Sequence, residues 1–400
     1  MTPPARVQAP SLRHLQRLSG PFGLYEHARF ARPRRRCGYC TDDAGRALGL
    51  ACRLPGDPYA EELASVTVAF LERAHLGAGQ FRLRLGPDGR WTADAPSDDA
   101  AGRALWGLGV AAADAPWEEV RDRAAALFDA AAAFRSPWPR ATAYATLGGA
   151  ELLGVAPAHR GARRLVAEAA ERLGAARAKA SSRAGRSKPE AGAAPGAGRS
   201  KIEAGTAPRV AWRWPEGRLT YANARLADSA LAAAVALGRP ELAEQALDRL
   251  GWLVEEETIG SRFSFAPTGG RGPGGPKPGF DQQPIEAWAT ADACARAGAF
   301  TADPIWATRL ERAILWFLGG NDTGVAMFDS STGGGYDGLG AHGVNRNEGA
   351  ESTMAFVATM LQAATAGMPP AASTARRPRR KGATGAGAGP QATLASAASR

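Results

Sequence analysis

Acidic residues recur in this chain at the starts of apolar, Ala-rich runs that have the spacing of helices. Asp43 and Asp99 each follow a first Asp at the head of such a run. Glu286 and Glu348 lie in or near the first turns of two later runs. Hydrolysis of a glycosidic bond uses two carboxyl groups, one protonated to donate to the leaving oxygen and one ionised to activate water or attack carbon. We therefore expect one of the two Asp residues and one of the two Glu residues to form a catalytic pair.

The position of each acid suggests its role in that pair. Free backbone N–H groups and the helix dipole stabilise a charged carboxylate in a first turn, which suits a base or a nucleophile. The acid partner needs a pKa raised by burial against apolar or aromatic neighbours. Glu286 is followed directly by Ala287 and Trp288, so it is the better candidate for the acid.

Capping of helix N-termini is the alternative role for these residues. An Asp at a helix start most often binds free backbone N–H groups, and Asp42 and Asp98 fit that role. The second acid of each pair falls one residue further on, where capping does not explain it. Glu348 and Glu351 are three residues apart and share a helix face, so one can close a capping box while the other points into the site.

Residues that could bind a sugar accompany the acids at the same helix starts and in the loops before them. Sugar recognition needs flat apolar surfaces and forked polar groups. Aromatic residues inside helical runs more often pack in a core, so those at helix starts and in loops are preferred. The predicted substrate-binding residues are Tyr39, Asp42, Arg46, Trp138, Trp214, Asn223, Arg225, Asp281, Gln282, Gln283, Tyr336, Asn345, Asn347 and Glu351.

Apolar residues three and four apart predict the elements that position these side chains. A twelfth helix could come from the segment before Phe22 or from the C-terminal tail. Paired helices that repeat every fifty to sixty residues or so indicate an array of hairpins, and we predict an all-α fold, an (α/α)6 toroid with a few short strands in its loops. Strands are expected at 80–85, 262–265 and 210–214. Helices are expected at 42–54, 59–75, 98–113, 117–134, 139–153, 158–177, 222–238, 240–257, 284–299, 303–319 and 348–366.

Low-complexity segments divide the chain. Residues 178–208 are almost entirely Ala, Gly, Ser, Arg, Lys and Pro, and bury too little apolar surface to offset chain entropy. We predict a single toroid domain over 22–366 that is interrupted by a disordered insertion at 178–208. Residues 1–21 are expected to be disordered or to form one short helix, and residues 367–400 to form a disordered basic tail.

Composition limits the classes of partner. The net charge of +10 is concentrated in the two low-complexity segments and in the run at 32–36, so we do not expect nucleic acid as a partner. Cys37 and Cys40 have CxxC spacing but lack a second pair or neighbouring His residues, so neither a metal nor a cofactor is expected. The chain shows no signal-peptide pattern and no apolar run of membrane-spanning length, which predicts a cytoplasmic protein.

Several motifs together resemble one bacterial family of six-hairpin glycosidase-like proteins. They are GYCTDD at 38–43, GRW at 89–91 with the run at 102–109, FDQQPIE at 280–286, WFLGGND at 316–322 and NRNEGAEST at 345–353. Members of this family are often encoded beside, or fused to, glycosyltransferases of polysaccharide pathways. The resemblance spans 22–361 outside the 178–208 segment. It implies an α/α toroid, a glycan substrate and a possible glycosyltransferase partner.

Three functions remain open from the sequence. The leading one is a glycoside hydrolase that acts on a bacterial oligo- or polysaccharide. Isomerisation or epimerisation of a sugar ranks lower, because it needs His bases at the mouth and the chain has five His in all. The alternative from another class is a non-catalytic glycan-binding or accessory protein that partners a glycosyltransferase. A terpenoid cyclase is disfavoured, because the chain lacks an Asp-x-Asp-Asp motif.

Overall fold

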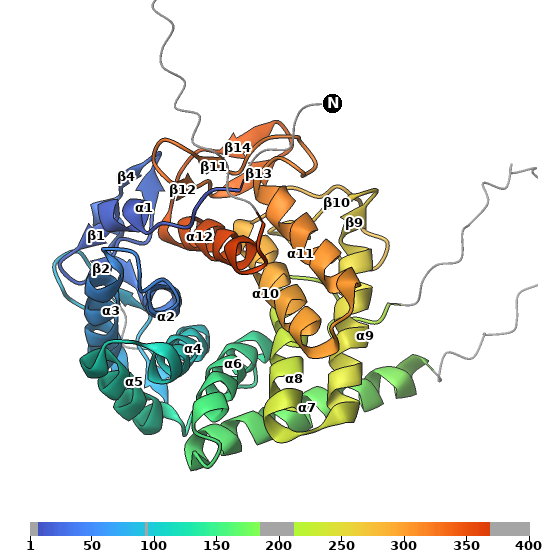
Figure 1. Ribbon diagram of the computed structural model, residues 1–400, viewed down its shortest axis with the longest axis horizontal. Coiled ribbons are helices and arrows are strands. Elements are labelled where there is room, and N and C mark those ends of the chain that lie inside the picture. The colour runs from blue at the N-terminus through green and yellow to red at the C-terminus, as the bar shows by residue number, and fades with distance from the viewer. Residues whose placement is uncertain (1–6, 93–94, 185–211, 369–400) are drawn as a thin grey trace, which may run out of the picture.

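The computed structural model describes residues 7–92, 95–184 and 212–368, and within them helical hairpins form a ring (Figure 1). Each inner helix contacts the next along the chain, and α12 contacts α2, so the inner ring is closed. This arrangement confirms the predicted all-α toroid. The inner helices are α2 (Thr41–Cys52), α4 (Asp98–Asp114), α6 (Pro139–Val155), α8 (Ala224–Leu237), α10 (Pro284–Thr301) and α12 (Ala350–Thr365).

An outer layer of helices covers the inner ring, each packed on its hairpin partner. The twelfth helix comes from the N-terminal segment, since the short α1 packs against α12. The predicted helix starts and ends agree with these elements to within a few residues, except that α7 runs to Ala184 and not to residue 177. The outer helices are α1 (Arg13–Arg17), α3 (Ala60–Ala74), α5 (Glu118–Ala131), α7 (Arg160–Ala184), α9 (Pro240–Glu256) and α11 (Pro304–Phe317).

The inner helices are buried on nearly every side, which explains their Ala- and Gly-rich composition. Helix α2 buries every residue except Asp42, whereas α3 buries one stripe. Glycine lets neighbouring backbones approach closely. A Cβ on Gly107 of α4 would lie 2.1 Å from the carbonyl oxygen of Gly45 on α2. A Cβ on Gly109 would lie 2.1 Å from the carbonyl oxygen of Gly148 on α6. Side chains at these two positions would force the inner ring apart.

Short and long connections alternate around the ring. The turns from an inner to an outer helix are short, as at 115–117, 238–239 and 302–303. The connections back to an inner helix are long, as at 75–97, 257–283 and 318–349, and they carry the short strands. The long loops therefore gather at the N-terminal ends of the inner helices, which is where the sequence predicts the site.

The strands form two-stranded antiparallel pairs within the described residues. Two of the three predicted strand segments contain strands, while residues 212–214 of the third are irregular and its first two residues lie outside the described part. The pairs are β1 (Ser19–Gly20) with β2 (Gly23–Leu24), β3 (Ala28–Arg29) with β4 (Arg32–Pro33), β5 (Tyr39–Cys40) with β8 (Arg84–Leu85), β6 (His75–Gly77) with β7 (Gln80–Phe81), β9 (Thr258–Ile259) with β10 (Arg262–Phe263), β11 (Phe328–Asp329) with β12 (Gly334–Gly335) and β13 (Gly338–Gly340) with β14 (Gly343–Asn345).

The low-complexity segments border the described residues. Helix α7 ends at Ala184, inside the segment expected to be an insertion, and the rest of that segment lies outside the described residues. The basic tail from residue 369 onward also lies outside them. Each described helix is too short or too polar to cross a membrane.

Candidate functional site

The N-terminal ends of the inner helices surround a cavity of about 480 Å³, here called the mouth cavity. A second hollow of about 640 Å³ shares some of its lining residues and includes Asp281 and His342. Residues predicted from four different helix starts therefore meet in one place. The predicted residues that line the mouth cavity are Asp42, Asp43, Arg46, Asp99, Gln283, Asn345 and Glu351.

Asp43 is the buried acid of the mouth cavity. It lies in the first turn of α2, and Arg46 follows three residues later on the same face, so their side chains meet at 2.9 Å. Arg46 also contacts Glu351 of α12 at 2.6 Å, which ties the two ends of the helical ring together. Asp43 is 3% exposed, and burial raises its pKa to about 8, because the cost of desolvation exceeds the attraction of Arg46. The carboxyl group is therefore largely protonated at neutral pH.

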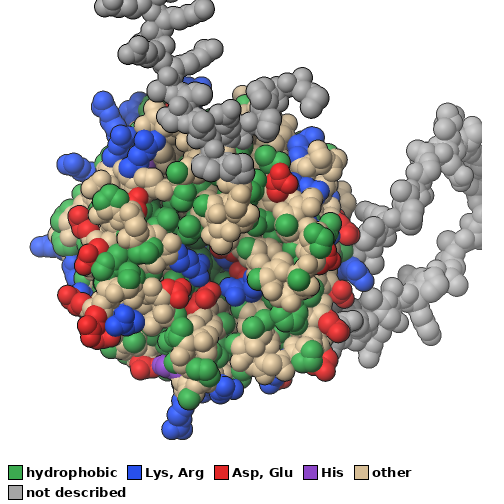
Figure 2. Space-filling view, in the orientation of Figure 1, with side chains coloured by type: hydrophobic (Ala, Val, Ile, Leu, Met, Phe, Trp, Pro, Cys, Tyr) green, Lys and Arg blue, Asp and Glu red, His purple; other side chains and the backbone are tan. Residues whose placement is uncertain are grey.

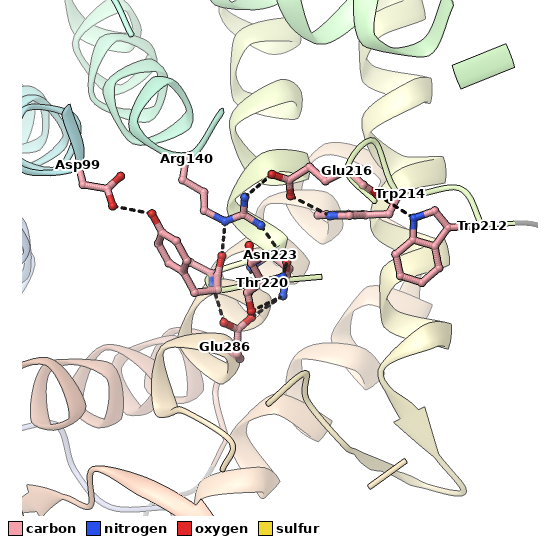
Figure 3. Close-up of polar contacts among 10 residues, drawn as sticks. Asp99, Arg140, Trp212, Trp214, Glu216, Thr220, Asn223 and Glu286 are labelled. Atoms are coloured by element: carbon pink, nitrogen blue, oxygen red, sulfur yellow. Dashed lines mark hydrogen bonds and ion pairs between the residues drawn. The ribbon is translucent and has the colours of Figure 1, made fainter. Parts of the chain in front are cut away.

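Asp99 is the more exposed acid of the same cavity. It lies in the first turn of α4, and its side chain is 37% exposed. The phenol of Tyr221 donates a hydrogen bond to Asp99 Oδ2 at 2.5 Å (Figure 3). Arg103, one turn along α4, lies 3.5 Å from the same oxygen. A phenol donor and a guanidinium group both suit an ionised carboxylate.

Arg103 lies beneath the mouth cavity and contacts one acid at each of two helix starts, Asp42 of α2 and Asp99 of α4. Its guanidinium lies 3.3 Å from Asp42 Oδ2 and is almost fully buried. It stacks over the ring of Tyr144 at 4.7 Å and faces the ring of Tyr221 at 5.7 Å. A buried cation held by two acids and two aromatic faces is fixed in position. It can therefore hold Asp42 and Asp99 in a fixed relation to each other.

Glu286 lies behind the cavity wall and binds the start of α8. Both of its carboxylate oxygens accept hydrogen bonds, from the backbone N–H of Ala222 and from the backbone and side-chain nitrogens of Asn223 (Figure 3). It is 2% exposed, and burial raises its pKa to about 7 against the effect of these hydrogen bonds. The geometry makes Glu286 a cap supplied to one inner helix by the next, because it lies in the first turn of α10.

Arg140 at the start of α6 organises the same region (Figure 3). It donates to the carbonyl oxygen of Tyr221, to Asn223 Oδ1 at 3.0 Å and to Glu216 at 2.7 Å. Glu216 also accepts from the indole nitrogen of Trp214 at 3.2 Å. Asn223 and Trp214, both predicted to bind substrate, are thus parts of a scaffold that places Tyr221, and neither lines the mouth cavity.

Glu348 is also held away from the cavity, beneath the loop that precedes α12. Its Oε2 accepts a hydrogen bond from Thr332 at 2.6 Å and lies 3.4 Å from His14 Nδ1. Burial raises the pKa of Glu348 and lowers that of His14. The side chain therefore joins α1 and the 318–349 loop to the N-terminal end of α12.

The other residues predicted to bind substrate lie outside the mouth cavity, at several different places in the fold. Tyr39 is buried and stacks on Tyr25 at 4.6 Å, and Gln282 is buried with its amide bound to Asp322 and Trp316. Arg225 is the second residue of α8. Its side chain lines a hollow at the end of the inner ring opposite to the mouth cavity. The remaining residues line neither mouth hollow: Tyr336, which is half-buried, Asn347, which binds the backbone of Phe30, and Trp138, which is 64% exposed.

Solved structures resemble this chain at the level of the fold. A cellobiose 2-epimerase from Bacillus thermoamylovorans has a TM-score of 0.59 at 10% identity, over 88% of this chain and 96% of that chain. A D-mannose isomerase has a TM-score of 0.59 at 10% identity, over 88% and 94%. A GH76 α-mannanase of Bacteroides thetaiotaomicron has a TM-score of 0.53 at 10% identity, over 88% and 93%. No protein-family model and no curated protein matches the chain.

The chain therefore shares the α/α-toroid fold of these solved structures. None of these structures bears on a glycosyltransferase partner, which stays a prediction. Across the described part of this six-hairpin toroid, no group of three His, Cys, Asp or Glu side chains is placed to hold a metal ion.

Among the lining residues of the mouth cavity that the sequence did not mark as site residues, four carry an acidic, guanidinium or imidazole side chain. They are Glu26, His27, Arg84 and Asp337. Arg84 binds Glu26 through two hydrogen bonds of 3.0 and 2.6 Å. These residues belong to loops and short strands, so no helix-start pattern marks them. Only Asp337 has a signal in the sequence that could have marked it. It lies in the Gly-rich loop at 333–338, before the last inner helix.

Proposed function

We propose that the protein is a carbohydrate-active enzyme that hydrolyses a glycosidic bond in a bacterial oligo- or polysaccharide at the mouth cavity. Asp43 is the general acid, and Asp99 is the base or nucleophile. The sequence paired one Asp with one Glu, but Glu286 and Glu348 are engaged in contacts behind the cavity. The pair proposed here is therefore the two aspartates.

The observation that carries the proposal is the difference between two acids in one cavity. Hydrolysis needs one carboxyl that stays protonated and one that stays ionised near neutral pH. Asp43 is buried, and its pKa of about 8 suits a proton donor. Asp99 is partly exposed and receives the Tyr221 phenol. The names of the similar solved structures, two of them sugar isomerising enzymes and one a mannanase, agree with a carbohydrate substrate.

The chemistry follows from these contacts. Asp43 transfers its proton to the glycosidic oxygen as the bond to the sugar breaks, and Arg46 stabilises the carboxylate that remains. The contacts of Asp99 are both made to Oδ2, so we assign Oδ1 as the atom that activates water or attacks the anomeric carbon. Tyr221 and Arg103 hold the ionised group in position while charge develops on the sugar.

A second candidate is isomerisation or epimerisation of a sugar, which one observation favours. The imidazole of His27 reaches the mouth cavity, and its Nε2 lies 3.7 Å from Glu26. A His beside a carboxylate can move a proton at a carbon next to a carbonyl group. Hydrolysis remains the first choice, because the two aspartates lie at the inner-helix starts and His27 is half exposed.

One experiment separates these functions. The full chain is incubated in D2O with a panel of bacterial oligo- and polysaccharides, and the products are followed by reducing-end assay and by NMR. Hydrolysis predicts new reducing ends. Deuterium incorporated next to the carbonyl carbon, with no new reducing ends, would replace hydrolysis by the isomerase function. Glycan binding with neither product would favour the non-catalytic alternative.

A further inference from the structure

A basic hairpin stands beside the mouth cavity and has no counter-charge of its own. Strands β3 and β4 place Arg29 directly opposite Arg32, and Arg34, Arg35 and Arg36 follow at once. All five side chains are exposed, and none forms an ion pair with an acid in the described part of the chain. Figure 2 shows basic side chains projecting at the upper left, over β4.

This arrangement is unfavourable for the protein alone. Like charges directly opposite each other on paired strands destabilise the pair. The hairpin also exposes Phe30, which is 59% exposed at the turn and has a φ of 50°. A non-glycine residue with positive φ is strained. Five uncompensated arginines, an exposed ring and a strained turn together indicate a surface shaped for a partner.

The hairpin is fixed to the site and forms part of its rim. Glu26 and His27, which lead into β3, line the mouth cavity. On the other side, the Phe30 N–H donates to Asn347 Oδ1 at 3.0 Å, and Phe30 O accepts from the Glu348 N–H at 3.1 Å. The loop at 345–349 contributes to the same cavity. A chain that leaves the cavity on this side would therefore pass over the hairpin.

From this geometry we infer that the substrate is an acidic glycan, whose uronic acid units lie on the basic hairpin while the bond to be cleaved lies in the mouth cavity. Arginine forks bind carboxylates through paired hydrogen bonds, and the Phe30 ring offers a flat face to sugar C–H groups. The cavity itself contains both acids and arginines, so the charged units are held outside it. The inference rests on the proposed function for its site and extends it to the class of substrate.

The test measures binding, so it does not depend on turnover. Asp99→Asn protein is titrated with polygalacturonate oligosaccharide and with the same oligosaccharide after reduction of its carboxyl groups. We expect tighter binding of the acidic form and a loss of that preference at high salt. Adding Arg29→Gln and Arg32→Gln should weaken binding of the acidic form roughly tenfold, about 1.4 kcal/mol, and leave the reduced form unchanged.

The control removes two arginines at the other end of the ring. Arg160→Gln with Arg163→Gln, in the exposed first turn of α7, lowers the net charge by the same amount and should not change binding. Equal affinities for the hairpin and control variants would overturn the inference. Tighter, hairpin-dependent binding to anionic lipid vesicles or to single-stranded DNA than to the acidic oligosaccharide would also overturn it. Retained acidic-glycan binding without hydrolysis by the wild type would refute the proposed function alone.

Discussion

The phenol of Tyr221 donates a hydrogen bond to Asp99 Oδ2 over 2.5 Å, and so joins the segment before α8 to the first turn of α4. Tyr221 is itself held by Arg140, which binds its carbonyl oxygen, and by Glu286, which binds the backbone of the next residue. Burial raises the pKa of Tyr221 well above its usual range, with a further contribution from Asp99. The phenol therefore stays a donor across the working pH range.

Tyr221→Phe tests the importance of this contact. A hydrogen bond to a charged group contributes ~1.5–3 kcal/mol, so kcat should fall by about tenfold to a hundredfold if the bond acts in the transition state. Tyr144→Phe is the matched control, because the Tyr144 hydroxyl is buried near the same Arg103 and has no hydrogen-bond partner among the described residues. Similar rates for the two variants would mean that the phenol does not assist Asp99.

The pH dependence of the rate should report Asp43. Because burial raises its pKa to about 8, the acid loses its proton as the pH rises through that value. We expect kcat to fall on the basic side of about pH 8 and the protein to stay folded there. A rate that keeps rising from pH 7 to pH 9 would argue against Asp43 as the proton donor. The measurement is a pH–rate profile with a circular dichroism spectrum at each pH.

The free energy of unfolding should also fall as the pH rises. Burial raises the pKa of Asp43 and Glu257 to about 8 and that of Glu286 to about 7. Between pH ~4 and pH 8 the folded state binds more protons than the unfolded state, so the free energy of unfolding should fall as the pH rises through this window. Urea unfolding at pH 5 and pH 8 measures the difference. Glu257→Gln should reduce it, and a protein more stable at pH 8 would contradict the account.

Glu286→Gln should affect folding more than chemistry. An amide can accept with its oxygen only, so the backbone N–H of Ala222 or of Asn223, just before α8, loses its partner at a cost of ~1–3 kcal/mol. The melting temperature should fall, while kcat per folded molecule stays near the wild-type value. Asp99→Asn should show the opposite pattern. Loss of activity at unchanged stability in Glu286→Gln would restore Glu286 as a catalytic candidate.

Arg225 should be a major contributor to barrel stability. Its guanidinium pairs with Asp228 at 3.0 Å and with Asp292 at 2.7 Å, and it stacks on Trp106 and Trp288. Removing one member of a buried ion pair leaves uncompensated charge and costs ~3–5 kcal/mol. We expect a loss of that size for Arg225→Met in chemical denaturation.

The control for this prediction lies in the same cluster of charges. Arg296 also binds Asp228, but its side chain is 31% exposed, and without it Asp228 still has Arg225 as a partner. Arg296→Met should therefore cost clearly less. Equal losses for the two arginine variants would show that burial does not set the difference. Figure 2 shows acidic and basic side chains gathered around the hollow at the centre of the ring.

The sequence predicted most of the helices, because their apolar spacing and start signals are local. The helix predicted at 139–153, for instance, is α6 over Pro139–Val155. It also placed Asp43 and Asp99 correctly at the first turns of inner helices. The sequence did not reveal which way a first-turn acid points. Glu286 has the same kind of position as Asp99, yet it faces the start of the neighbouring helix.

The loop residues of the site were beyond sequence reasoning for a different reason. Glu26 and Arg84 meet across 58 residues of chain, and His27 reaches the cavity because the N-terminal hairpin folds over it. Such contacts depend on how separate loops pack together. No periodic pattern encodes them, so only the folded chain reveals them.

The assignment of Asp43 and Asp99 is tested most directly by the rate of reducing-end release from three folded variants and the wild type. Asp43→Asn and Asp99→Asn each remove one proposed catalytic group. Asp98→Asn is the control, because this neighbouring acid is bound by Ser136 Oγ at 2.7 Å and does not line the mouth cavity. The account predicts release by the wild type and by Asp98→Asn, and a rate near background for the other two. Equal rates for all four proteins would contradict it.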